Sequence, residues 1–233
     1  MAADVVLLPL PLCREGDTLN IEGEHRGAGA LFHRFRRHQL LLAGQVKPSQ
    51  KAEALELGLN LVDYFRREEL TVANAAATAE GTVQVILEGL ERSLLGSRCL
   101  VLGFGRIGKV LAHDLSALGA KVSVSARKRS DLAWIDAFGY APLHTNRLSG
   151  TLGEFRVVFN TVPHQVLDET LLSELPRDCL LIELAGASGF DMDAVERLRL
   201  SYLRAPGLPG RVAPETAARA IQKTLTRLME EDT

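Results

Sequence analysis

The sequence predicts an α/β protein, with a doubly wound, parallel-sheet Rossmann domain and a smaller, incomplete-looking N-terminal α/β domain. Three observations in the middle of the chain carry this prediction. Residues 99–102 form a short apolar run that leads into the glycine pattern of residues 103–108. A helical pattern follows and stops at Gly119, and residues 121–125 form a second apolar run. This order of strand, glycine turn, helix and strand is typical of a dinucleotide-binding fold.

Each glycine of the pattern has its own expected function. Gly103 permits the tight turn, Gly105 lets the backbone approach a pyrophosphate, and Gly108 lets the helix pack closely on the strand. The pyrophosphate then lies at the helix N-terminus, where free amides and the helix dipole favour an anion. We therefore expect the cofactor to contact this turn, including Arg106 and Ile107.

The end of the second strand indicates which dinucleotide binds. An acidic residue here would bind the ribose hydroxyls of NAD, whereas an arginine accommodates the extra phosphate of NADP. The chain has Arg127 and Lys128 here, and its next carboxylate is Asp131. We predict NADP, with Ser125 as a hydrogen-bond donor and Arg127 as the planar phosphate partner. NAD is the other nicotinamide cofactor considered, and a solvated basic turn is the alternative interpretation.

Composition excludes several classes of protein. The 233 residues are 46% hydrophobic, which is enough for real cores, and the formal net charge of −2 gives no general attraction to nucleic acid or anionic membranes. Cys13, Cys99 and Cys179 lie far apart in apolar segments, as expected of buried free thiols in the cytoplasm. The histidines and cysteines lack metal-ligand spacing, so no metal is predicted. The basic residues between 33 and 38 are interpreted as a solvated face.

The expected domains are an N-terminal domain over residues 1–90, a nucleotide-binding domain over 91–213 and a C-terminal helix over 214–233 that packs back toward the first. Strands are predicted at residues 5–10 and 40–43, and helices at 49–57 and 71–95, the second capped by Thr71. Gly81 inside the long helix costs about 1 kcal/mol relative to alanine. It therefore indicates close packing of another helix or a ligand.

Three further strands are predicted in the second half of the chain, at residues 156–159, 180–184 and 202–204. The carboxyl ends of such strands line the ligand crevice of a doubly wound sheet. The predicted cofactor contacts here are Leu184, which ends one of these strands, and Thr161, Pro163 and Ala185, which follow them. Residues 206–210 are predicted to be a loop, and Pro214 to begin the closing helix.

Six segments, taken in order, resemble the family of dipicolinate synthase A subunits: 78–81, 101–108, 118–122, 126–127, 159–163 and 205–214. The most specific is the last, which contains Pro-Gly-Leu-Pro-Gly-Arg-Val-Ala-Pro. The resemblance implies a two-domain relative of the D-2-hydroxyacid dehydrogenases that works with a flavoprotein-like B subunit of dipicolinate synthase in sporulating bacteria. It also implies that dihydrodipicolinate is oxidised to pyridine-2,6-dicarboxylate with a nicotinamide cofactor.

That reaction makes an aromatic ring, so the protein would chiefly orient the substrate against the nicotinamide and assist one proton transfer. Within the family-like segments, Glu80 is the candidate proton acceptor or substrate-orienting group, with a solvated helix face as the alternative. Candidate donors to the two substrate carboxylates are Thr78, Asn160, Thr161 and Arg211.

Two departures from the family pattern limit this expectation. Family members generally open with a further strand–helix–strand stretch of roughly 60 residues. Either the start of the sequence is misplaced or the first domain is shortened, and a shortened sheet would have an unpaired edge that favours homo-oligomers. The loop after Leu184 also lacks the cation that the family usually carries there.

Two other functions stay open. One is an NADP-dependent 2-hydroxyacid dehydrogenase, whose arginine and histidine would fall at Gly186 and at residues 208–210, where neither occurs. The other is a catalytically degenerate nucleotide-binding component of a synthase complex. Hydride-transfer activity would separate an enzyme from this last possibility.

Overall fold

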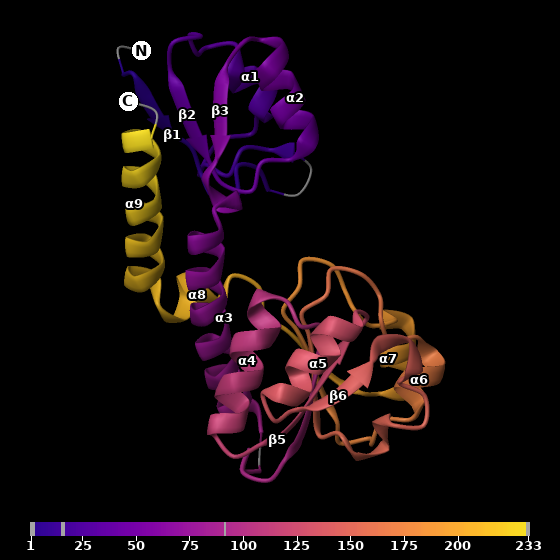
Figure 1. Ribbon diagram of the computed structural model, residues 1–233. Helices are drawn as coiled ribbons and strands as arrows, with labels where there is room; N and C mark the ends of the chain where they lie inside the picture. The colour runs from indigo at the N-terminus through magenta and orange to yellow at the C-terminus, as the bar shows by residue number, and fades with distance from the viewer. Residues whose placement is uncertain (1–2, 15–16, 91, 232–233) are drawn as a thin grey trace. The chain divides into compact units, whose positions relative to one another are not determined.

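The computed structural model describes residues 3–14, 17–90 and 92–231. The chain divides into two compact units (Figure 1). The first unit comprises Met1–Ala73 and Ala218–Thr233, and the second comprises Asn74–Ala217. Two helices, α3 (Glu68–Gly89) and α9 (Pro214–Glu231), carry residues of both units.

The first unit contains a parallel three-stranded sheet in the order β1-β2-β3. The strands are β1 (Val5–Leu7), β2 (Leu40–Ala43) and β3 (Asn60–Asp63), with helices α1 (Ala28–Phe32) and α2 (Pro48–Glu56) and the short 3-10 helix η2 (Tyr64–Arg66). The central strand β2 is buried throughout because both of its faces are covered. Its Leu41 packs with Phe32 and Ala54, and its Leu42 packs with Leu225 of α9. A strand covered on both sides has a continuous apolar sequence.

The second unit contains a parallel six-stranded sheet in the order β6-β5-β4-β7-β8-β9. Its strands are β4 (Arg98–Leu102), β5 (Lys121–Ala126), β6 (Ala141–His144), β7 (Val157–Asn160), β8 (Leu180–Glu183) and β9 (Ser201–Arg204). Its other helices are α4 (Arg106–Ala117), α5 (Arg129–Ala137), α6 (Glu169–Ser173), α7 (Met192–Leu198) and α8 (Leu208–Val212), with short 3-10 helices η3 (Thr145–Arg147) and η4 (Leu152–Glu154). The direction of strand order reverses between β4 and β7, so the ligand crevice of this sheet is expected there.

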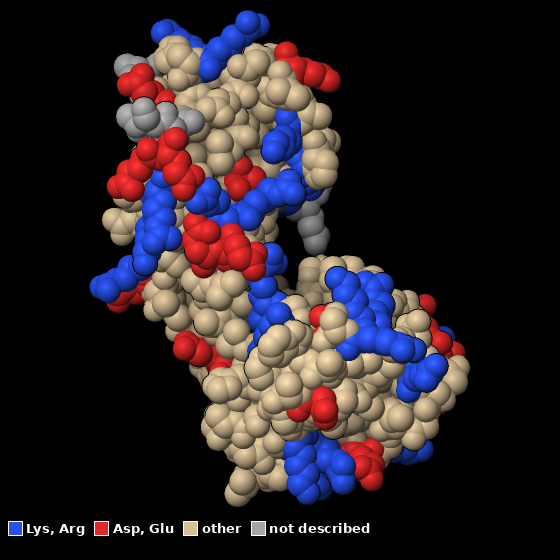
Figure 2. Space-filling model, viewed as in Figure 1, with Lys and Arg blue, Asp and Glu red and all other residues tan. Residues whose placement is uncertain are grey.

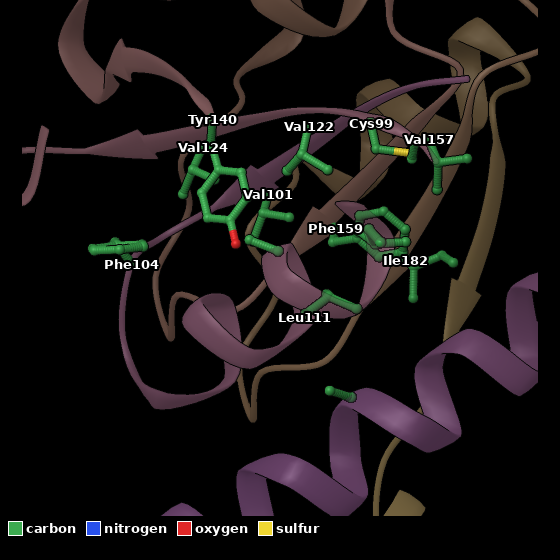
Figure 3. Packing of buried hydrophobic residues seen from close by; sticks show 14 of the residues in the cluster. Cys99, Val101, Phe104, Leu111, Val122, Val124, Tyr140, Val157, Phe159 and Ile182 are labelled. Carbon is green, nitrogen blue, oxygen red and sulfur yellow. The ribbon is translucent and has the colours of Figure 1, made fainter. Parts of the chain in front are cut away.

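Apolar side chains cover both faces of this sheet, which confirms the predicted doubly wound class. On one face, Val101 and Phe159 pack with Leu111 of α4 (Figure 3). On the other face, Leu100 and Val158 pack in a second cluster that includes residues of α6 and α7. The predicted strands that form β4, β7 and β8 are therefore the buried centre of the domain, whereas β9 lies at the edge of the sheet and is mostly exposed.

Several predictions about elements were wrong. The strand predicted over residues 5–10 is β1, and it ends at Leu7. The long helix begins at Glu68, and the Thr71 hydroxyl donates to the carbonyl of Glu68 inside the helix instead of capping it. The helix ends at Gly89 and does not continue to residue 95. The predicted loop 206–210 is partly helical, because α8 begins at Leu208.

The structure also explains Gly81. A Cβ atom placed on Gly81 would lie 2.9 Å from Cγ2 of Val212 and 3.0 Å from Cβ of Leu208. The close packing of another helix, predicted from this glycine, is thereby confirmed, and the helix is α8. The segment 205–214 therefore packs on α3 at a position where that helix has no side chain.

Candidate functional site

The glycine turn after β4 forms a cradle at the start of α4. Gly103 has φ +99°, and a Cβ there would lie 2.7 Å from Oγ1 of Thr161. A Cβ on Gly108 would collide with the carbonyl oxygen of Gly103, so neither position accepts a side chain. A Cβ on Gly105, by contrast, would meet no atom within 4 Å. The open side of the turn is thus at Gly105, where the α4 amides begin, and this geometry fits an anionic pyrophosphate.

Residues around this turn tie it to the neighbouring strands. The amide of Gly103 donates to the carbonyl of Ser125 at 3.0 Å, which joins the turn to β5. The hydroxyl of Thr161 donates to the carbonyl of Leu102 at 2.8 Å, which joins the start of the turn to the residue that follows β7. Thr161 therefore lies against the turn, where a cofactor contact was predicted. Arg106 is exposed and Ile107 is half-buried at the start of α4.

The end of β5 carries exposed basic side chains. Arg127 and Lys128 are exposed, and Lys128 is the N-cap residue of α5. Figure 2 shows that Lys and Arg side chains gather in patches on the surface of this unit. Arg127 also lines a cavity of about 470 Å³, together with Thr145, Asn146, Ser149, His164 and Val166. This cavity lies among the segments that follow β5, β6 and β7, on the carboxyl side of the sheet.

Ser125 was expected to donate a hydrogen bond to the phosphate of NADP, but the structure buries it. It is only 1% exposed, and its hydroxyl lies 3.5 Å from that of Thr145. In this conformation its side chain has almost no surface for a phosphate. The basic residues Arg127 and Lys128 are therefore the accessible groups at this strand end.

A buried polar network connects the ends of β7 and β8. Asn160 is fully buried, and its Nδ2 donates to the carbonyl oxygen of Val162 and to Oε1 of Glu183, both at 2.8 Å. Both hydrogens of this amide are thus used inside the protein. A Cβ on Gly189 would collide with the side chain of Asn160, so the loop after β8 packs directly on it. Asn160 was expected to bind substrate, and the structure places it beneath the crevice loops.

Glu183 is a residue of this site that the sequence analysis missed. It is 1% exposed and accepts hydrogen bonds from Nδ2 of Asn160 and from the amides of Ala185 and Gly189, each at 2.8 Å. Burial raises the pKa of Glu183, while these hydrogen bonds and the charge of Arg204 oppose the rise. A lone carboxylate at the end of the apolar run 180–184 was the available signal.

The other expected site residues lie on two different parts of the unit. Pro163 is exposed, and Leu184 and Ala185 are half-buried, with the amide of Leu184 donating to the carbonyl of Asn160 at 3.0 Å. These residues share the carboxyl edge of the sheet with the glycine turn. Arg211 is exposed on α8.

Thr78 and Glu80 belong to α3. Thr78 is 6% exposed, and its hydroxyl donates to the carbonyl of Asn74 at 2.7 Å. Glu80 is exposed and lies close enough to Asp114 of α4 that its charge adds to the effect of burial in raising the pKa of Asp114. Asp114 comes eight residues after the first residue of α4, or about 12 Å along the helix axis. The structure therefore places Glu80 beside the later turns of α4.

None of the helices that the structure describes is both long and apolar enough to cross a membrane. Within the same residues, no group of three or more His, Cys, Asp or Glu side chains could hold a metal ion. All three cysteines are buried free thiols, as predicted.

Comparisons with known proteins agree with this geometry. Residues 66–199 match the family model "D-isomer specific 2-hydroxyacid dehydrogenase, NAD binding domain". The chain is 33% identical over 195 residues to the A subunit of dipicolinate synthase from Bacillus subtilis (strain 168), covering 83% of this chain and 66% of that protein. Among solved structures, it matches the A subunits of dipicolinate synthase from Bacillus subtilis and from Bacillus halodurans. Each has a TM-score of 0.88 and 30% identity; the matches cover 98% and 97% of this chain and 78% and 79% of theirs.

The fold, the glycine turn and the matched family define the second unit as a nicotinamide-dinucleotide-binding domain of the dehydrogenase type. The relatives that match most of the chain are more specific than this class, and the chain belongs to the family of dipicolinate synthase A subunits. It spans 66% of the length of the curated Bacillus subtilis relative.

Proposed function

We propose that this chain is the NADP-linked dehydrogenase component that oxidises dihydrodipicolinate to dipicolinate in the cytoplasm during sporulation. The observation that carries the proposal is the glycine turn, which is open at Gly105 and lies beside the basic end of β5. The relatives in Bacillus subtilis and Bacillus halodurans are A subunits of dipicolinate synthase, which supports dipicolinate as the product. Dihydrodipicolinate is the substrate that the family resemblance implies. NAD is the alternative cofactor.

The cofactor would lie across the carboxyl edge of the sheet. The turn residues Gly103, Gly105, Arg106, Ile107 and Gly108 would hold the pyrophosphate. Arg127 and Lys128 would hold the extra phosphate of NADP, because a guanidinium binds a phosphate through two parallel hydrogen bonds. Thr161, Pro163, Leu184 and Ala185 would contact the nicotinamide half. When bound, the cofactor would supply the hydride acceptor for oxidation of the substrate ring, which becomes aromatic on loss of a hydride and a proton.

The protein's own part in the reaction is to orient the ring and accept that proton. Arg211 is the proposed donor to the substrate carboxylates. The side-chain donors of Thr161, Asn160 and Thr78 are used inside the protein, so these residues would act by holding the surrounding backbone. Glu80 is kept as the proposed proton acceptor or substrate-orienting group, and its exposed position beside the later turns of α4 makes a solvated helix face the alternative to be tested. A Glu80→Gln variant should lose turnover and keep its nucleotide affinity, and unchanged turnover would remove Glu80 from the mechanism.

The first experiment is a fluorescence titration of the purified protein with NADPH and NADH, repeated with Arg127→Ala. We expect NADPH to bind more tightly, and the variant to lose that preference while keeping its affinity for NADH. Equal binding of the two cofactors by the wild type would indicate a solvated basic turn. Formation of dipicolinate from dihydrodipicolinate is then followed by its ultraviolet absorbance, with and without the flavoprotein-like B subunit.

The matched family model supports a second candidate function, an NADP-dependent 2-hydroxyacid dehydrogenase. Oxidation of simple 2-hydroxyacids under the same conditions would favour it. Nucleotide binding without activity on either substrate class would indicate a degenerate component of a synthase complex. Size-exclusion chromatography, alone and with the B subunit, tests the proposed homo-oligomer and the proposed complex.

A further inference from the structure

A cation lies over the loop that follows β8. Arg204 is the last residue of β9, and it is paired in the sheet with Glu183, the last residue of β8. Its Nη2 donates to the carbonyl oxygen of Gly186 at 3.2 Å. The side chain is exposed, so the guanidinium bridges from the edge strand to the tip of this loop at the surface.

The carboxylate beneath this loop does not use Arg204 as a hydrogen-bond partner. Glu183 accepts its hydrogen bonds from Asn160, Ala185 and Gly189. Arg204 nevertheless lies close enough for its charge to lower the pKa values of both Glu183 and Tyr202, against the effect of burial. A guanidinium has five N–H donors, and the bond to Gly186 uses one of them. Further donors on an exposed side are thus available to a ligand.

The position of Arg204 in the sheet indicates which part of the site it faces. A dinucleotide lies across the point where strand order reverses, with one half over each half of the sheet. If the NADP phosphate binds at Arg127 after β5, the nicotinamide lies toward the ends of β7 and β8. The loop that Arg204 covers is then beside the reacting ring, where the substrate must bind.

A cation at this place would favour an anionic substrate beside the buried Glu183. A substrate carboxylate that approaches the loop also approaches a buried carboxylate, and like charges disfavour each other. Arg204 is close to Glu183 and exposed, so it can offset that repulsion and donate two parallel hydrogen bonds to the incoming group. Lysine could supply the charge but only as a point donor.

We propose that Arg204 is a substrate-binding residue that holds one carboxylate of the dicarboxylate substrate, with its guanidinium oriented by the carbonyl of Gly186. The inference rests on the proposed function, because it needs the nicotinamide and an anionic substrate on this half of the sheet. It adds a residue from β9 to the donors expected from the sequence.

The test is calorimetric titration of dipicolinate into the NADPH-saturated protein. Wild type is compared with Arg204→Ala, Arg204→Lys and the control Arg177→Ala. Arg177 is exposed and precedes β8, so it lies at the amino-terminal end of the strands, away from the proposed site. Hydrogen bonds to charged groups contribute about 1.5–3 kcal/mol, so we expect Arg204→Ala to weaken dipicolinate binding by about 10- to 100-fold. The lysine variant should lie between, and Arg177→Ala should equal wild type. NADPH affinity and melting temperature should be unchanged in all variants.

A second readout separates substrate binding from simple fastening of the loop. In turnover assays, Arg204→Ala should raise KM for dihydrodipicolinate with a smaller change in kcat. Unchanged dipicolinate affinity in Arg204→Ala would overturn the inference and leave the proposed function intact. Loss of NADPH affinity or of melting temperature in both Arg204 variants would assign Arg204 to fastening the loop. A wild-type protein that binds NADPH but no dipicolinate would overturn the proposed substrate and this inference with it.

Discussion

At the scale of single residues, each unit has a carboxylate at a strand end that accepts backbone amides. Asp63 ends β3 and accepts hydrogen bonds from the amides of Gln45, Val46 and Phe65 at 3.0–3.1 Å. Glu183 ends β8 and does the same for the loop that follows it. In both cases the carboxylate satisfies amides that no ladder pairs, and an unmade hydrogen bond is costly in the interior. These acids therefore fix the backbone of the loops beside the strand ends.

Glu183→Gln should destabilise the second unit. One side-chain oxygen is replaced by an N–H donor, which then faces an amide of Ala185 or Gly189 or the amide of Asn160. We expect the free energy of unfolding to fall by about 1–3 kcal/mol, the cost of an unsatisfied buried group. Urea unfolding measures this, with Glu196→Gln on the exposed surface of α7 as the matched control. Equal stability of both variants and wild type would show that the charge and geometry of Glu183 are dispensable.

The buried thiols predict how stability depends on pH. Burial raises the pKa of Cys99 and of Cys179 to about 12, whereas an unfolded cysteine titrates near pH 8.5. Between these values the unfolded protein releases protons that the folded protein keeps, so stability is lost as pH rises. The loss should be about 2 kcal/mol per thiol between pH 8 and 10. Urea unfolding at both pH values checks this: Cys99→Ala should lose less stability than wild type over that interval, and an equal loss would contradict it.

At the scale of elements, two of the segments that resemble the family, 78–81 and 205–214, pack against each other. The short helix α8 packs on α3 at Gly81, through Leu208 and Val212. The glycine and the Leu-Pro-Gly-Arg-Val sequence therefore fit each other as two sides of one contact. Packing alone thus explains why these two segments occur together in the sequence, and no shared function is needed to explain it.

Gly81→Ala should destabilise the protein although alanine is the better helix former. The gain in helix propensity is about 1 kcal/mol, but the new Cβ would lie 2.9 Å from a methyl of Val212, whose branched side chain is stiff, and 3.0 Å from the Cβ of Leu208. Overpacking costs about 1–3 kcal/mol, so we expect a net loss of about 1 kcal/mol. Gly89→Ala is the matched control, because a Cβ there meets nothing within 4 Å. Urea unfolding should show no loss for Gly89→Ala, and stabilisation by both changes would refute the contact with α8.

The strongly patterned elements were predicted from the sequence, and weakly patterned short ones such as β6 and α8 were missed. Strands such as β4 and β7 are continuous apolar runs beside glycine or polar loops, and that signal is strong. β6 was missed because it contains Pro142, which an edge strand tolerates. In the candidate site, the glycine turn was predictable because its residues are consecutive. The burial of Ser125 and the network of Asn160 with Glu183 were not, because they depend on contacts between distant segments.

At the scale of the whole molecule, each unit has its own apolar cores. The clusters of the first unit combine its sheet with α1 and α2 on one side and with α9 on the other. Two clusters of the second unit cover the two faces of its six-stranded sheet. Arg67 before α3 also forms a bidentate ion pair with Glu231 of α9, at 2.7 and 2.8 Å, within the first unit. Each unit thus has the contacts of a folding unit of its own.

This division predicts where a bound nucleotide stabilises the protein. All proposed cofactor contacts belong to the second unit, and a ligand at 100 times its Kd stabilises the folded state that binds it by about 2.7 kcal/mol. Hydrogen exchange with saturating NADPH should therefore slow in the central strands β4 and β7 by roughly 100-fold where exchange requires opening of that unit. The amides of β2 should exchange at the same rate with and without nucleotide. Equal slowing in β2 and β7 would show instead that the two units open as one, and slowing in β2 alone would place the nucleotide in the first unit.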